Sequence, residues 1–113
     1  MEEVKAVSVL RLEELSQRMY GGLVKAVVDI EQQRMVIDAE MHADEESYLL
    51  ENGSLQKDLW GINLHPAYYG TDDFIEFDSM INIRPIQNNR SRSVEDPNNR
   101  RLIHEVVAEK VYE

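Results

Sequence analysis

The chain has 113 residues, of which 42% are hydrophobic, so it is long enough to form one domain with its own core. It contains no cysteine, which excludes disulfides, thiolate metal sites and a cysteine nucleophile. Its formal net charge of −10 repels nucleic acids and anionic membranes, so we expect neither as a partner.

The composition also predicts where the protein resides and how it assembles. The first residues have neither the basic nor the apolar stretch of a signal peptide, and no apolar run approaches the ~18 residues of a membrane span. Together with the lack of cysteine, this predicts a soluble cytoplasmic protein. A domain of this size buries a modest share of its surface, which favours a homodimer.

The N-terminal part of the chain is predicted to form a short helix. Leu12, Leu15 and Met19 recur at helical spacing, which indicates a helix over roughly residues 11–20. A short strand within residues 4–9 is expected to precede it.

A hairpin follows this helix. Residues 24–30 and 35–41 have strand-like patterns, and the segment 31–34 is short enough for the connecting loop. Val28 and Ile37 are expected to face the core, since a one-residue slip would exchange the two faces.

The middle of the chain is predicted as a short helix and a strand. Asp44 is a good N-cap for a helix over residues 45–52, and Gly53 is a good stop. Residues 59–64 form the next strand candidate.

The last third contains a long strand candidate over residues 74–84, expected to bend or break near Asp78. Asp96 followed by Pro97 is a strong helix start, which predicts a helix over about residues 97–112. The whole chain, residues 1–113, is therefore expected to form a single α+β domain. Its mainly antiparallel sheet would have four to five strands, with a short N-terminal, a short middle and a long C-terminal helix.

Strand alternation places many polar side chains on the sheet face that turns away from the core. A histidine beside carboxylates suits proton transfer, so Glu40, His42 and Asp78 are candidate catalytic residues of a small hydrolase or nucleotide-processing enzyme. In that enzyme Arg84 would orient an anionic group of the substrate. The alternative, which we favour, is the solvated face of an antiparallel sheet. The spacing matches no zincin or EF-hand motif, so no metal site is predicted and no cofactor is assigned. The face includes Lys25, Glu40, His42, Asn63, Asp78, Asn82 and Arg84.

A second candidate site lies in the arginine-rich segment before the last helix. Arg84, Arg90 and Arg92 precede a helix N-terminus, and such a combination suits an anionic small molecule. Asn63 and Asn82 are included as amide ligands of that site. The alternative is that the arginines pair with acidic residues and only hold the loop down.

Four motifs together resemble a family of small prokaryotic proteins classed as a domain of unknown function. The resemblance extends from about Leu12 to the last helix, and Asn88 and Ser93 stand where glycine is expected. It implies a small single-domain protein and no particular activity, so we hypothesise a binding or interaction module, with the hydrolase as alternative. The motifs are His42-Ala43-Asp44-x-Glu46, Leu59-Trp60-Gly61-x-Asn63, Ser79-x-Ile81-Asn82-Ile83-Arg84-Pro85 and Asn89-Arg90-Ser91-Arg92.

Overall fold

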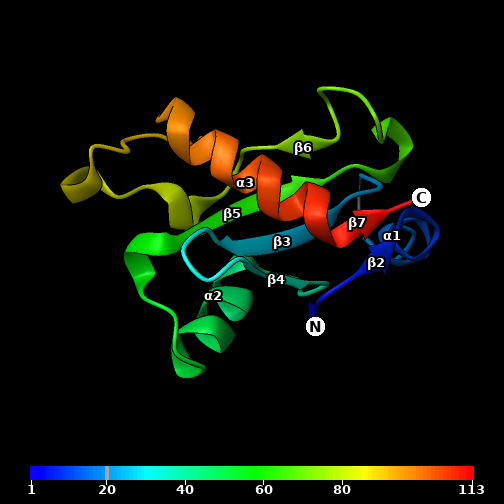
Figure 1. The fold of residues 1–113 in the computed structure, drawn as a ribbon, viewed down its shortest axis with the longest axis horizontal. Helices are drawn as coiled ribbons and strands as arrows, with labels where there is room; N and C mark the ends of the chain where they lie inside the picture. Colours follow the sequence, from blue (N-terminus) through cyan, green and yellow to red (C-terminus); the bar gives the residue numbers. More distant parts are fainter. Residues whose placement is uncertain (20) are drawn as a thin grey trace.

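A five-stranded sheet forms the centre of the protein (Figure 1). The computed structural model describes residues 1–19 and 21–113. Every neighbouring pair of strands in the order β1-β4-β3-β5-β6 is antiparallel, and three α-helices within the described residues accompany the sheet, which confirms the predicted α+β class. The strands are β1 (Glu2–Val4), β3 (Val24–Asp29), β4 (Arg34–Ile37), β5 (Leu59–Leu64) and β6 (Ile75–Glu76).

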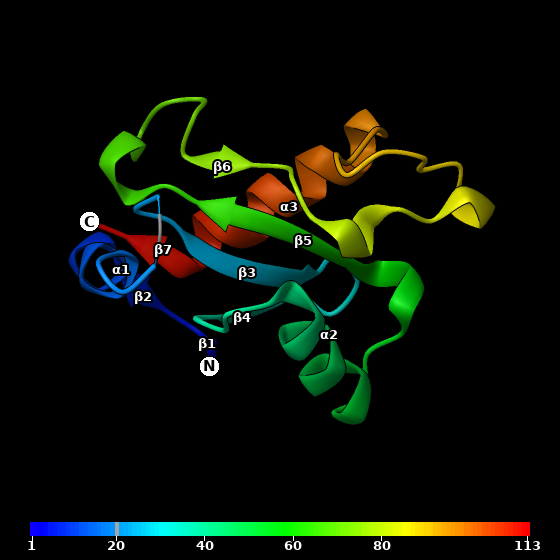
Figure 2. The same cartoon turned by 180° about the vertical axis from the view of Figure 1, so that it is seen from behind.

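The helices α2 (His42–Glu51) and α3 (Pro97–Lys110) cover opposite faces of this sheet (Figures 1 and 2). The main core lies on the α3 side, where Ile103 and Val106 pack against the sheet and α1 (Val9–Ser16). None of the helices in the described part of the chain is long and apolar enough to cross a membrane.

The predicted hairpin is confirmed with the predicted faces, but its second strand ends at Ile37, so residues 38–41 of the predicted strand lie outside the sheet. Strand β3 pairs with β4 so that Ala26 lies opposite Ile37 and Val28 lies opposite Met35. Val28 and Ile37 are both fully buried in the main core.

The second face of the sheet is not the solvated surface that we favoured from the sequence. Val27, Val36, Leu49 and Leu59 form a second small core there, beneath α2. Alternation assigned Val27 and Val36 to the correct face. Helix α2 packs on them because leaving two valines exposed to water is unfavourable. Polar side chains of this face are therefore confined to its margins.

Helix α2 begins at His42, three residues before the predicted start. Met41 is the N-cap, with φ −131° and ψ 138° and no side-chain hydrogen bond to the helix, so the prediction of Asp44 as N-cap was wrong. The Asp44 amide donates to the Met41 carbonyl, which places Asp44 in the first turn, where the helix dipole favours its charge. Gly53 adopts φ +101° directly after the C-cap, as its predicted role as a stop requires.

The predicted strand over residues 74–84 was wrong beyond its first residues, since only β6 is formed there. The chain then turns through short 3-10 helices, and the Asn82 side chain takes the place of a strand partner for Gly61. Its Oδ1 accepts from the Gly61 amide at 2.8 Å, and its Nδ2 donates to the carbonyls of Gly61 at 2.9 Å and Arg92 at 3.0 Å. A Cβ atom at Gly61 would lie 2.6 Å from Ser79, so only glycine lets this loop approach β5 so closely.

The ends of the described chain differ from the predictions in detail. Helix α1 begins after Ser8, whose hydroxyl accepts from the Arg11 amide at 3.0 Å, and it ends at Ser16. Position 20, the predicted last residue of this helix, lies outside the described residues. The predicted first strand is divided into β1 and β2 (Val7–Ser8), and β2 pairs in parallel with β7 (Val111–Tyr112). This pairing ends α3 at Lys110.

Candidate functional site

A pocket of about 180 Å³ lies at the N-terminal end of α2 and brings together four of the predicted site residues. We term it the α2 pocket. Its polar lining includes Lys25, His42, Asn63, Asp78 and Arg92.

The sheet register positions the floor of this pocket. Lys25 on β3 lies directly opposite Asn63 on β5, and Asn63 lies directly opposite Glu76 on β6. Side chains at such positions stand on one face within about 5 Å of each other at Cβ. Among the described residues, no carboxylate lies within ion-pair distance of the Lys25 ammonium.

Asn63 is only 6% exposed, and one of its polar side-chain atoms has no hydrogen-bond partner among the described residues. Its Nδ2 donates to Glu76 Oε1 at 3.0 Å and to the Asp78 carbonyl at 3.3 Å, whereas its buried Oδ1 receives no hydrogen bond from residues 1–19 or 21–113. Glu76 Oε1 also lies 3.0 Å from His65 Nε2. The hydrogen bonds from His65 and from Asn63 lower the pKa of Glu76, so its carboxylate stays charged and holds the amide in this orientation.

His42 is the first residue of α2, and a backbone group orients its ring. Its Nε2 donates to the Ile62 carbonyl at 2.8 Å. Burial lowers the pKa of His42, and this effect outweighs the opposite effect of the hydrogen bond and of Asp78. The ring is therefore neutral at physiological pH, and Nδ1 is left as an acceptor.

Asp78 and Arg92 form an ion pair at the rim, with 2.5 Å between Oδ1 and Nε. Both side chains are about half exposed, and their charges cancel. Lys25 is therefore the uncompensated cation of the pocket.

The N-terminus of α2 contributes backbone donors to the same pocket. Met41, His42 and Ala43 line it, and the N-cap carries no side-chain cap. In the described residues, the amides of His42 and Ala43 have no protein acceptor, as is usual for the first turn of a helix. They add the positive end of the helix dipole to the charge of Lys25.

The other proposed catalytic groups lie elsewhere. Glu40 lines a different, acidic pocket beside Asp38 and Asp44. Arg84 is 8% exposed; it stacks 4.1 Å above the Trp60 ring and donates to the carbonyls of Gln56 and Leu59. Burial lowers the pKa of this guanidinium. The carboxylate–histidine–arginine set expected for the hydrolase is therefore not assembled in one pocket.

The arginine-rich loop is held by its own polar side chains. The Asn89 Nδ2 donates to the carbonyls of Asn82 and Ser93 at 2.7 Å, and its Oδ1 accepts from the Glu95 amide. Asn88 has φ +61°, a conformation in which glycine is the usual residue and asparagine is tolerated. The side-chain amide of Asn82 forms its hydrogen bonds with backbone groups. Arg90 is exposed and does not line the α2 pocket. At the start of α3, Asp96 caps the helix as predicted.

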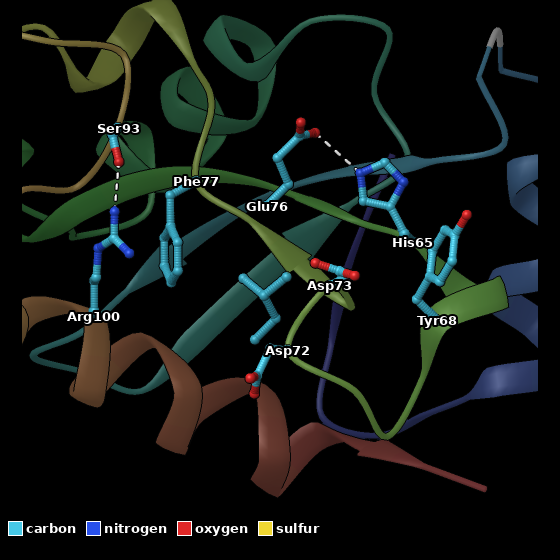
Figure 3. A pocket seen from close by; sticks show the side chains of 9 residues that line it. His65, Tyr68, Asp72, Asp73, Glu76, Phe77, Ser93 and Arg100 are labelled. Atoms are coloured by element: carbon cyan, nitrogen blue, oxygen red, sulfur yellow. Dashed lines mark hydrogen bonds and ion pairs between the residues drawn. The ribbon is translucent and has the colours of Figure 1, made fainter.

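A larger open pocket of about 530 Å³, shown in Figure 3, lies beside β6. Four of its polar groups bond one another, His65 with Glu76 and the Arg100 guanidinium with Ser93 Oγ at 2.7 Å, and Asp72 and Asp73 make the rest of its polar lining acidic. No set of three metal-ligating side chains is found in the described part of the chain. We therefore take the smaller α2 pocket, with its unpaired groups, as the candidate site.

Sequence reasoning singled out four members of this pocket but missed two contributors. Lys25 was placed on the correct face, and its position opposite Asn63 could have identified it if the register had been known. The helix N-terminus was missed because Asp44 was taken as its cap.

Comparison with known proteins agrees with the sequence resemblance. The model of the family described as Protein of unknown function (DUF5674) matches residues 4–110. No curated protein matches the chain. No solved structure matches it either. Because the family model spans nearly all of its residues, the chain belongs to the DUF5674 family, whose function is unknown.

Proposed function

We propose that this protein binds a small anionic molecule in the α2 pocket. The observation that carries the proposal is the meeting of Lys25 with the uncapped N-terminus of α2 in one pocket. A cation without a carboxylate partner and free helix amides together favour an anion.

The charge and size of the pocket limit the ligand. Since Asp78 and Arg92 neutralise each other, Lys25 alone is left to be balanced, which suits a single negative charge. Pockets for drug-sized ligands have volumes of roughly 300–1,000 Å³. At about 180 Å³ the α2 pocket fits a molecule smaller than a nucleotide.

The hydrolase alternative has less support. It required Glu40 and Arg84 beside His42 and Asp78, and these two side chains line other parts of the protein. On the composition and size discussed above, we also propose a cytoplasmic location and a homodimer, and light scattering at micromolar concentration tests the dimer.

Backbone-amide NMR during a titration with inorganic phosphate and with acetate tests the binding proposal. We expect saturable shifts at Lys25, His42, Ala43 and Asn63. Lys25→Met should weaken binding about tenfold or more, because it removes the charge-assisted contact. Lys5→Met, on an exposed lysine outside the pocket, is the matched control and should bind as the wild type does. Equal affinities of the two variants, or no shifts in the pocket at millimolar ligand, would refute the proposal.

A further inference from the structure

The α2 pocket contains an unpartnered acceptor on a buried side chain, the Nδ1 of His42. His42 is 8% exposed and lines the pocket. Its Nε2 donates to the Ile62 carbonyl, so the neutral ring carries its proton on Nε2 and a lone pair on Nδ1. Nδ1 forms no hydrogen bond with any described residue. Unlike the Oδ1 of Asn63, it is not one of the fully enclosed polar atoms, so a ligand in the pocket can reach it.

This acceptor lies beside the donors that bind the anion. Nδ1 is bonded to the ring carbon next to Cβ, so it stays close to the backbone of its own residue, the first of α2. The amides of His42 and Ala43 belong to the same turn, and Lys25 lines the same pocket. An oxyanion held by these three donors therefore has an oxygen near Nδ1.

The protonation of that oxygen decides whether binding is favourable. An unprotonated oxygen would direct a lone pair at the lone pair of Nδ1, and neither atom could donate. An oxygen that keeps its proton donates to Nδ1 instead, and a buried acceptor gains from such a partner. The preferred anion therefore has both kinds of oxygen, and it carries the single negative charge that balances Lys25.

We infer that the ligand is a phosphate group in its monoanionic form, free or as a small ester, and that its hydroxyl donates to the Nδ1 of His42. This inference rests on the proposed function. The two unprotonated oxygens of the phosphate accept from Lys25 and from the amides of His42 and Ala43. Sulfate esters and carboxylates also carry one negative charge, but they have no acidic hydroxyl and would leave Nδ1 facing an unprotonated oxygen.

Methyl phosphate and methyl sulfate test this inference by calorimetry on the full chain at about pH 7. The two esters have the same shape, and the monoanion of methyl phosphate differs in having a hydroxyl on the central atom. This monoanion should bind about tenfold or more tightly than methyl sulfate, because only it gives Nδ1 a donor. Inorganic phosphate is measured beside them, and the tighter of the two phosphate compounds identifies free phosphate or an ester as the source. Equal affinities for methyl sulfate and the methyl phosphate monoanion would overturn the inference.

The pH dependence of binding gives a second readout. A phosphate monoester loses its second proton with a pKa of about 6, so its monoanion becomes about tenfold rarer between about pH 7 and about pH 8. The Kd of methyl phosphate should therefore rise about tenfold over this range. Lys25, Arg92 and Asp78 are the charged groups that act on the His42 ring, and methyl sulfate, whose own charge is constant, reports any titration of them. A Kd of methyl phosphate that stays level or falls, relative to that of methyl sulfate, would show that the dianion binds and would contradict the inference.

The His42→Phe variant removes the acceptor and keeps an aromatic ring, with His104→Phe at an exposed position of α3 as the control. The ratio of affinities for the methyl phosphate monoanion and methyl sulfate should fall to near one in His42→Phe and stay unchanged in His104→Phe. An unchanged ratio in His42→Phe would rule out this role of Nδ1. If His42→Phe fails to fold, the two esters on the wild type still decide. If methyl sulfate or acetate binds as tightly as the phosphate compounds, this inference fails and the proposed function stands; if no anion binds, both are wrong.

Discussion

The role of Asn82 as a substitute for a strand partner can be tested with one isosteric change, Asn82→Asp. The Asn82 side chain is fully buried and donates to the carbonyls of Gly61 and Arg92 through its Nδ2. An ionised carboxylate would direct an oxygen at these two carbonyls, so the folded state should keep the introduced group protonated. A protonated carboxyl still donates to one of the two carbonyls.

The size of the effect follows from this protonation. A free aspartate has a pKa of about 3.9, so holding it protonated at about pH 7 costs about three pH units, or about 4 kcal/mol. The lost second donor adds about 1 kcal/mol. The folded pKa is raised above the unfolded one, so the variant loses stability as the pH rises from about 4. We expect a deficit of about 1 kcal/mol below about pH 4 that grows to about 5 kcal/mol at about pH 7.

Urea denaturation of both proteins across this pH range measures the deficit. Asn98→Asp, at an exposed position in the first turn of α3, is the control and should stay within about 0.5 kcal/mol of the wild type. A deficit for Asn82→Asp that does not change with pH would refute this account of the Asn82 amide.

Two further changes address the packing of β5 and the titration of a buried carboxyl in α2. Gly61→Ala should destabilise the protein by about 1–3 kcal/mol, because its Cβ would overlap Ser79, and adding Ser79→Gly should recover part of this loss in urea denaturation; purely additive effects would contradict the predicted overlap. Burial raises the pKa of Glu45 from its usual 4.5 to about 9, so the wild type loses stability as the pH rises through this window. Glu45→Gln removes this titration, so its free energy of unfolding should rise relative to that of the wild type by about 1.4 kcal/mol per pH unit between about pH 5 and about pH 8. A difference in free energy of unfolding that is independent of pH would contradict the raised pKa of Glu45.

Local sequence patterns predicted most of the fold, because strand alternation and helix capping depend on residues close together in the chain. The hairpin of β3 and β4 and the start of α3 follow from alternation and from the Asp96-Pro97 pair. The segment after β6 was mispredicted because its partner is a side chain, and no periodicity in the sequence reports that Asn82 replaces a strand.

The candidate site was predictable only in part, for a related reason. Alternation placed Lys25 and Asn63 correctly on one side of the sheet, and both line the α2 pocket. His42 and Asp78 line it too, but they lie beyond the ends of the strands to which the sequence assigned them. Whether this face of the sheet is open to water depends on where α2 packs, and strand alternation does not report the position of a helix. The role of Arg84 was the hardest to predict. Its guanidinium donates to backbone carbonyls and stacks on Trp60, and no sequence pattern distinguishes such an arginine from one that binds a ligand.

The side chains of Asn82 and Arg84 also have a consequence for the behaviour of the protein in a crowded solution. An open strand edge is a template on which another chain can add a strand, and this is a common route to aggregation. Strand β6 covers β5 only at Asn63 and Leu64. Beyond it, Asn82 occupies the backbone groups of Gly61 and Arg84 occupies the carbonyl of Leu59. Two side chains thus protect from intermolecular pairing an edge that would otherwise need a longer neighbouring strand.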